Sequence, residues 1–129
     1  MSTTPQFYAF GINDIVQIST ANTARDGTGT IATLVTAPTP GGCTIETISV
    51  RATGTTTAGQ VRLFYREIST DTWRLISELA IAAVTPSATV QTVGGTFATG
   101  SIMLPAGAEL GVATHAAETF NVWAQGGRY

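Results

Sequence analysis

The sequence predicts an all-β protein, an antiparallel β-sandwich of about eight strands, and three observations support this prediction. Threonine, valine and isoleucine are abundant, and their branched side chains favour the pleated surface of a sheet. Glycine and proline interrupt the chain about every eight to twelve residues, a spacing typical of sandwiches. No window carries the sustained 3.6-residue apolar period of a helix. Among antiparallel sandwiches, we expect a jelly roll.

The clearest strand is predicted over residues 72–84, where apolar and polar residues alternate. This alternation places four large apolar residues on one face, namely Trp73, Leu75, Leu79 and Ile81. Residues 60–68 alternate in the same way, and the link over residues 69–71 is short and turn-like. We therefore expect the two segments to form an antiparallel hairpin.

A further strand is predicted over residues 43–53, with Ile48, Val50 and Ala52 pointing inward. Ile45 is out of phase with these residues, which indicates either a β-bulge or a strand covered on both faces. The remaining strands are expected at residues 14–20, 29–36, 90–97, 100–104, 109–114 and 119–125, with a break at Gly94 and Gly95.

The length of 129 residues indicates one domain. We assign residues 13–129 to a single β-sandwich and treat residues 1–12 separately. Phe7, Tyr8 and Phe10 bring three aromatic rings close to Pro5. Residues 1–12 are either a first edge strand of the same sandwich or an extended arm that lies on a neighbouring subunit.

No residue pattern indicates catalysis or metal binding. His115 is the single histidine, and although Glu118 follows three residues later, the segment is predicted to be a turn between strands. A catalytic zinc needs three protein ligands, and a nucleophile needs a base beside it. Cys43 is the single cysteine and is expected to be a small buried residue in a strand, in a protein made in a reducing cytoplasm. We expect no enzyme and no cofactor.

The charges give no signal for nucleic acid or for a membrane. The net charge is −2, and all six basic residues are arginines. Four of them fall on adjacent predicted strands, where Glu46, Glu67 and Glu78 are available as cross-strand partners; they are Arg51, Arg62, Arg66 and Arg74. No aromatic residues interleave with them, and no apolar run reaches about 18 residues.

The low charge content instead predicts self-association. Charged residues make up 11% of the chain, against about 25% in an average soluble domain. The exterior must therefore be largely threonine, serine, alanine and glycine, a surface we expect to be covered by copies of the chain in a homotrimer. The expected assembly contacts are Phe7, Tyr8, Phe10, Trp123 and Tyr129.

Several stretches resemble a group of small all-β proteins encoded among the structural genes of tailed bacteriophages and prophages. They include residues 27–37 (GTGTIATLVTA) and 45–64 (IETISVRATGTTTAGQVRLF), and also residues 73–78, 104–107, 114–122 and 126–129. The resemblance implies a virion component, a head decoration (cement) protein that contacts the major capsid protein. It also fits the predicted trimer, because such proteins are often β-sandwich or jelly-roll trimers.

A second interpretation is a receptor- or carbohydrate-binding module of a phage tail or fibre. Sandwiches that bind sugars display exposed aromatic residues beside carboxylates or amides. Since Trp73 is predicted to point inward, the candidates are Trp123, Asn121 and Gln125.

Overall fold

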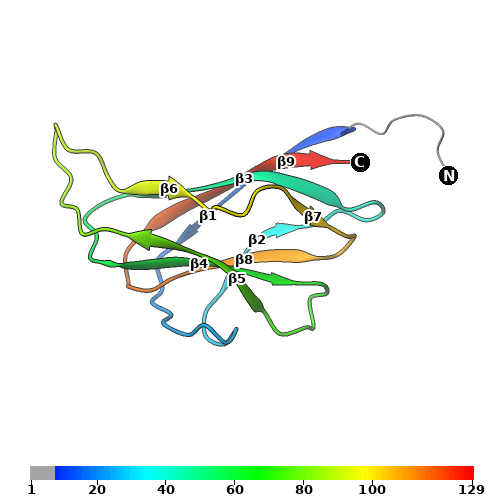
Figure 1. The fold of residues 1–129 in the computed structure, drawn as a ribbon, viewed down its shortest axis with the longest axis horizontal. Coiled ribbons are helices and arrows are strands. Elements are labelled where there is room, and N and C mark those ends of the chain that lie inside the picture. Colours follow the sequence, from blue (N-terminus) through cyan, green and yellow to red (C-terminus); the bar gives the residue numbers. More distant parts are fainter. Residues whose placement is uncertain (1–7) are drawn as a thin grey trace.

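A computed structural model describes residues 8–129 and contains nine strands in two antiparallel sheets that pack face to face (Figure 1). The first, called the β1 sheet, has the order β1-β9-β3-β6, and β7 pairs with the other half of β3. Its strands are β1 (Phe10–Ile18), β9 (Phe120–Arg128), β3 (Cys43–Ala52), β6 (Gly94–Thr96) and β7 (Ile102–Leu104).

The second, called the β2 sheet, has the order β2-β8-β4-β5. Its strands are β2 (Ala32–Thr36), β8 (Glu109–Thr114), β4 (Gly59–Arg66) and β5 (Arg74–Ile81). The predicted all-β sandwich is confirmed. The structure has nine strands where about eight were expected, and β6 and β7 are two short strands along one edge of β3.

The two layers enclose one main core of aliphatic and aromatic side chains. Alternate residues of β3 and β9 face alternate residues of β4 and β8 across it, as the two-residue period of a strand requires. Its fully buried members include Ile48, Val50, Phe120, Val122, Val61, Leu63, Leu110 and Val112. Cys43 is buried here as predicted, and burial raises the pKa of its thiol.

The out-of-phase position of Ile45 reflects a β-bulge, one of the two predicted alternatives. The register between β3 and β9 shifts between Ile45 and Thr47, so Glu46 is the extra residue. Ile45 is thereby turned into the core, where it is fully buried.

The predicted hairpin is also confirmed, but the side of the sheet predicted for Trp73 and Leu75 was wrong. Leu63 pairs with Ser77 whereas Phe64 pairs with Leu75, so a bulge at Ile76 interrupts the alternation of β5. Leu79 and Ile81 contact the main core, while Trp73 and Leu75 pack on the opposite, outer face of the sheet. One inserted residue reverses the facing of everything beyond it.

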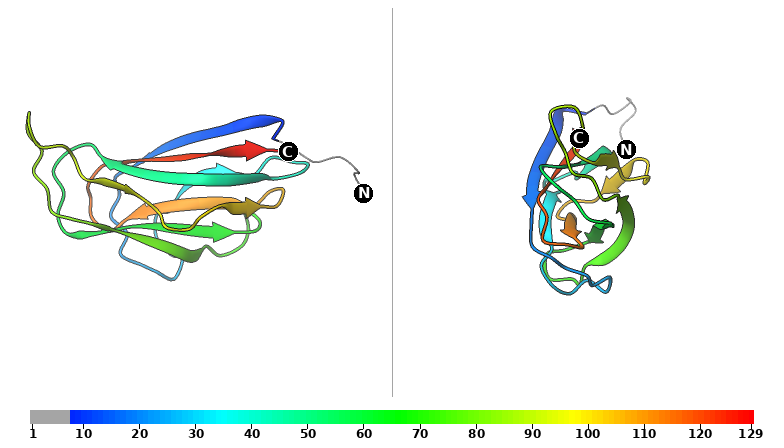
Figure 2. Two further views of the ribbon diagram at one scale, coloured as in Figure 1. Left: turned by 45° about the horizontal axis from the view of Figure 1, so that its top comes forward. Right: turned by 90° about the vertical axis from the view of Figure 1, so that its left-hand side faces the viewer.

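Both described ends of the chain lie at the same end of the sandwich, as Figure 2 shows. β1 starts at Phe10, so residues 10–12 are the beginning of this edge strand, and Ala9 donates a backbone hydrogen bond to Arg128. The connection over residues 82–93 projects beyond the opposite end (Figure 1). Within residues 8–129, no helix is long and apolar enough to cross a membrane.

Candidate binding face on the β1 sheet

The outer face of the β2 sheet is covered by the chain's own loops. Residues 19–31, which join β1 to β2, fold across it, and the Asn22 side chain holds them by donating to the carbonyl oxygens of Thr28 and Thr30 at 3.0 Å each. Beneath this cover lies a second small core of Phe64, Trp73 and Ala113 with Ile31 and Leu75. The middle of this face is therefore covered by the chain itself.

Ion pairs join this cover to the strands beneath it. Arg62 is only 1% exposed, and its Nε donates to Glu78 at 2.9 Å. Arg25 reaches the same carboxylate from the loop at 2.8 Å. Burial by itself would raise the pKa of Glu78, but the hydrogen bonds from Arg25 and Arg62 outweigh it, and the pKa lies below its usual value.

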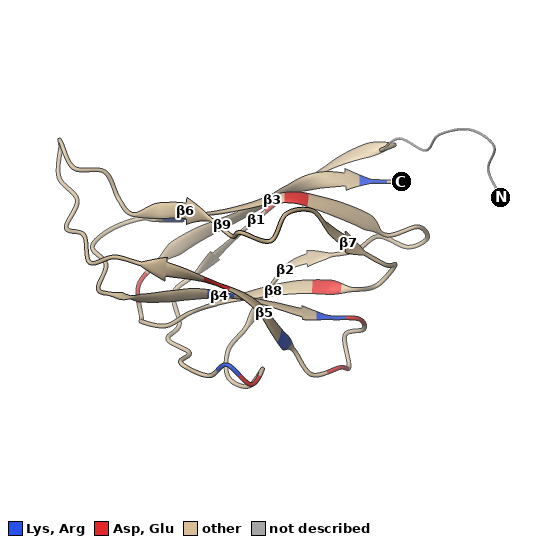
Figure 3. Ribbon diagram, viewed as in Figure 1, with Lys and Arg blue, Asp and Glu red and all other residues tan. Residues whose placement is uncertain are grey.

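A separate ion pair joins β4 to β8 at the other end of this face. Arg66 pairs with Glu109 at 2.7 Å and stacks over the ring of Trp73, 4.0 Å from its centre. The sequence analysis had offered Glu46, Glu67 and Glu78 as partners for the arginines, and only Glu78 has this role among the described ion pairs. Figure 3 shows that the charges concentrate on β4, β5, β8 and the adjacent loops.

No loop among residues 8–129 folds in this way across the outer face of the β1 sheet. On this face, residues that pair across β1, β9, β3 and β6 form two rows that run perpendicular to the strands. One row consists of Ile15, Trp123, Ser49 and Thr96, and the next of Gln17, Asn121, Arg51 and Gly94. These eight residues are called the open face. Ile15 is 64% exposed and Trp123 is 40% exposed, large fractions for apolar side chains.

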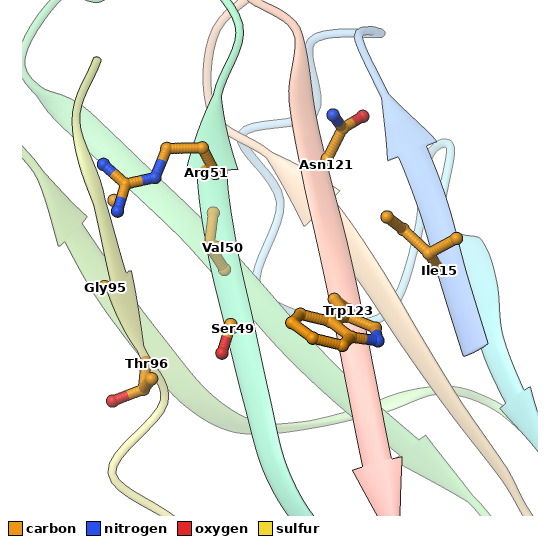
Figure 4. A pocket seen from close by; sticks show the side chains of 9 residues that line it. Ile15, Ser49, Val50, Arg51, Gly95, Thr96, Asn121 and Trp123 are labelled. Atoms are coloured by element: carbon orange, nitrogen blue, oxygen red, sulfur yellow. The ribbon is translucent and has the colours of Figure 1, made fainter. Parts of the chain in front are cut away.

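A groove of about 510 Å³ crosses the open face between Trp123 and β6. Figure 4 shows the indole of Trp123 between Ile15 and Ser49, and the side chain of Arg51 directed toward β6. A Cβ at position 94 would lie 2.6 Å from Cζ of Arg51, so Gly94 leaves the space that the guanidinium occupies. There Nη1 of Arg51 donates to the carbonyl oxygen of Thr92 at 2.7 Å.

Polar groups along the groove are oriented by the neighbouring strand β1. The amide oxygen of Asn121 accepts a hydrogen bond from Nε2 of Gln17 at 3.0 Å. The amino group of Asn121 therefore points toward the groove (Figure 4). Nε1 of Trp123 donates to Asn13 on the far side of the ring. Both contacts fix side chains that a ligand would touch.

Three of the predicted assembly residues, Tyr8, Phe10 and Tyr129, gather at the end of the β1 sheet where the chain ends lie. The rings of Tyr8 and Tyr129 are 5.5 Å apart, and the ring of Tyr8 lies on Gly127, where any Cβ would collide with it. Phe10 is 67% exposed, and Met103 on β7 is 74% exposed. Tyr8, Met103 and Tyr129 lie on the outer face of the sheet, whereas Phe10, whose cross-strand partner Arg128 pairs in turn with the buried Cys43, lies on the opposite face. Together these four side chains, Tyr8, Phe10, Met103 and Tyr129, surround this end of the sheet and are called the terminal patch.

Hydrogen bonds fasten the terminal patch to its own sheet. The hydroxyl of Tyr8 donates to Glu46, which also accepts from Ser101 at 2.8 Å. The bond from Tyr8 and then that from Ser101 lower the pKa of Glu46, and the bond to Glu46 raises the pKa of Tyr8. Tyr8 is thus held on its own subunit.

The other predicted residues lie elsewhere. Trp123 pairs with Ile15, five positions along β1 from Phe10, which is about 17 Å away at the rise of a strand. Phe7 lies outside the described residues. The exposure of Ile15 and Met103 was not predicted from the sequence, because alternation alone does not reveal which sheet keeps an uncovered outer face. Arg51 was expected to pair with a carboxylate, and no described ion pair involves it.

The turn around His115 is braced by hydrogen bonds. The backbone N–H of His115 donates to Gln60 at 2.9 Å, and the Glu118 carboxylate accepts from the N–H and hydroxyl of Thr57 at 2.8 and 2.9 Å. Within residues 8–129, no three histidine, cysteine or acidic side chains come together as a metal site.

Comparison of the chain with protein-family models, with curated proteins and with solved structures gave no match.

Proposed function

We propose that this chain is a non-enzymatic structural protein of a phage particle. It assembles as a homotrimer, decorates the head by contacts with the major capsid protein, and is made in the bacterial host cytoplasm before it joins the virion. The observation that carries the proposal is the terminal patch, where four large apolar side chains are exposed at one end of a sheet. The resemblance to small phage structural proteins supports the particle assignment.

The distribution of charge supports self-association through this sheet. Four charged residues lie on strands of the β1 sheet, namely Asp14, Glu46, Arg51 and Arg128. Nine lie on the β2 sheet or in the loops over residues 19–31 and 67–73 that flank it, namely Arg25, Asp26, Arg62, Arg66, Glu67, Asp71, Arg74, Glu78 and Glu109. Copies can approach at the β1 sheet with little charge to desolvate.

The strand order supports the jelly-roll interpretation. β6 and β7 flank the same edge of β3 and act as one interrupted strand. The chain then alternates between the layers, with β1, β3, β6/β7 and β9 in one and β2, β4, β5 and β8 in the other. An eight-strand double sheet of this kind is the architecture of many capsid proteins.

Removal of the terminal patch tests the proposal. Burying Phe10 or Met103 on a neighbour contributes about 1.5–3 kcal/mol each, so F10S/M103S should shift a trimer to monomer in sedimentation velocity at high micromolar concentration. The matched control is I68S/I76S, which removes two exposed apolar residues, one from the loop after β4 and one from β5. A parent protein that sediments as a monomer, or a control that dissociates equally, contradicts the proposal.

A receptor- or carbohydrate-binding role is the second candidate, and the open face favours it. Trp123 and Asn121 line the groove, and Gln125 is exposed on the same face of β9. Trp73, in contrast, is covered. An aromatic ring beside amide groups on an uncovered sheet is the arrangement that this role requires.

A further inference from the structure

We propose that the groove on the open face binds a carboxylated saccharide, such as a uronic or sialic acid residue of a surface glycan. The sugar ring stacks on the indole of Trp123, and its carboxylate pairs with the guanidinium of Arg51. This inference rests on the carbohydrate-binding role described above and names its ligand class. It is independent of the terminal patch, which lies at another part of the sheet.

Trp123 supplies the stacking platform. Its indole is 40% exposed and is held by its own hydrogen bond to Asn13, so little conformational freedom is lost on binding. The π face of an aromatic ring is electron-rich and attracts the polarised C–H bonds of a sugar. Ser49, the cross-strand neighbour of Trp123, is small and forms the floor beside the ring.

Arg51 supplies an uncompensated positive charge. Arg25, Arg62 and Arg66 each contact a carboxylate, whereas among the described ion pairs none involves Arg51. The groove lining contains no aspartate or glutamate. The Arg51 side chain is held at one amino group by Thr92, and its remaining N–H groups are available to an anion.

The remaining lining groups favour an acceptor-rich ligand. The amino group of Asn121 donates, and the hydroxyls of Ser49 and Thr96 have no hydrogen-bond partner among the described contacts. Together with Arg51 they would bind the ring oxygens and hydroxyls of a sugar acid. The groove volume of about 510 Å³ lies within the range of ligand sites and has room for a short oligosaccharide.

A singly charged carboxylate fits this groove better than a phosphate. Phosphate sites normally combine several cations with free backbone N–H groups. Here Arg51 is the one cation of the lining, and β3 and β9, which have paired strands on both sides, direct their backbone N–H groups into sheet pairing. A nucleotide, which could stack its base on Trp123, is therefore disfavoured and becomes an outcome of the test.

Titration by nuclear magnetic resonance with matched sugars tests the inference. The probes are methyl glucuronide and methyl glucoside, which share a ring and differ in the carboxylate, with sodium acetate and uridine monophosphate as further probes. We expect the glucuronide to shift the signals of the Trp123 indole and of Arg51 and Asn121. Its affinity should exceed those of the glucoside and of acetate about tenfold, and should fall as salt is added.

Two variants separate the contributions. R51Q should lower affinity for the glucuronide about tenfold and leave the glucoside unchanged, whereas W123A should weaken both sugars. The matched control R74Q removes an exposed arginine from the β2 sheet and should bind like the parent. Circular dichroism establishes that each variant is folded.

Each contrary result identifies what fails. Equal affinity for the two sugars overturns the carboxylate preference while leaving carbohydrate binding intact. Absence of shifts in the groove with either sugar at tens of millimolar overturns both. Tighter binding of uridine monophosphate assigns the groove to nucleotides instead. A parent protein that is monomeric but still binds the glucuronide contradicts the assembly proposal and supports the binding inference.

Discussion

The two sheets of this sandwich share one core but present very different outer faces. On the β2 sheet, a loop of the same chain folds over the strands, Trp73 is 8% exposed, and Arg62 is buried with its charge paired to Glu78. On the β1 sheet, Trp123 is 40% exposed and Arg51 has no such partner in the described ion pairs. Each face has one tryptophan near an arginine, in opposite environments.

This difference separates stability from recognition. A covered aromatic residue and a paired charge contribute to the folded state, and neither side chain is free to contact a ligand. An uncovered aromatic residue and an uncompensated cation contribute less to folding and leave binding energy for a partner. Substitutions at equivalent positions of the two faces should therefore change different properties.

The largest contrast is expected between the two tryptophans. W73A removes a ring from the small core and from its stack with Arg66, and should lower the free energy of unfolding by about 3–5 kcal/mol. W123A removes a ring with one side in water and should cost about 1–2 kcal/mol. Urea unfolding of both variants measures the difference, and equal costs would show that the two faces are equally important for folding.

A smaller contrast is expected between two glycines that face outward. A Cβ at Gly111 would lie 2.7 Å from Ile31 and 2.9 Å from Trp73, so G111A should destabilise by about 1–3 kcal/mol through overpacking. A Cβ at Gly11 would have no atom within 4 Å, and G11A should be nearly neutral. Thermal melting compares them. A neutral G111A would mean that the loop over the β2 sheet yields without cost.

The smallest effect concerns acid stability. Because the pKa of Glu78 is lower in the folded protein than its usual 4.5, Glu78 stabilises the fold above about pH 4.5, and this contribution is lost as the pH falls through the folded pKa. The parent should lose up to about 1 kcal/mol more than E78Q on acidification to pH 3. Urea unfolding at pH 7 and pH 3 measures this, and identical pH dependence would contradict it.

Much of the fold followed from local patterns. The hairpin of β4 and β5 and the bulge beside Ile45 were predictable because period-two alternation is a property of neighbouring residues. β8 was placed at its observed bounds, Glu109–Thr114. The same reasoning failed at Trp73, because the bulge at Ile76 arises from the pairing of β5 with β4. Ser77 is a polar residue at an inward-facing position, so the apolar alternation of the sequence did not indicate the bulge.

The groove was only partly predictable. Trp123, Asn121 and Gln125 were candidates from the sequence because Trp73 was predicted to point inward. Arg51 was assigned to a carboxylate partner, and its position over Gly94 depends on the pairing of β3 with β6, more than forty residues away in the chain. Ile15 joins Trp123 only through the pairing of β1 with β9.

The all-β sandwich with few charges was predictable from the amino-acid sequence, because strand propensity, alternation and composition are properties of short segments. Which outer face is covered and which is open became clear from the three-dimensional structure. That outcome depends on where the loop over residues 19–31 folds and which strands pair, and both are set by contacts between residues far apart in the chain. Contacts with residues distant in the chain bury Trp73 on the outer face of the β2 sheet, whereas Trp123 stays exposed on the β1 sheet.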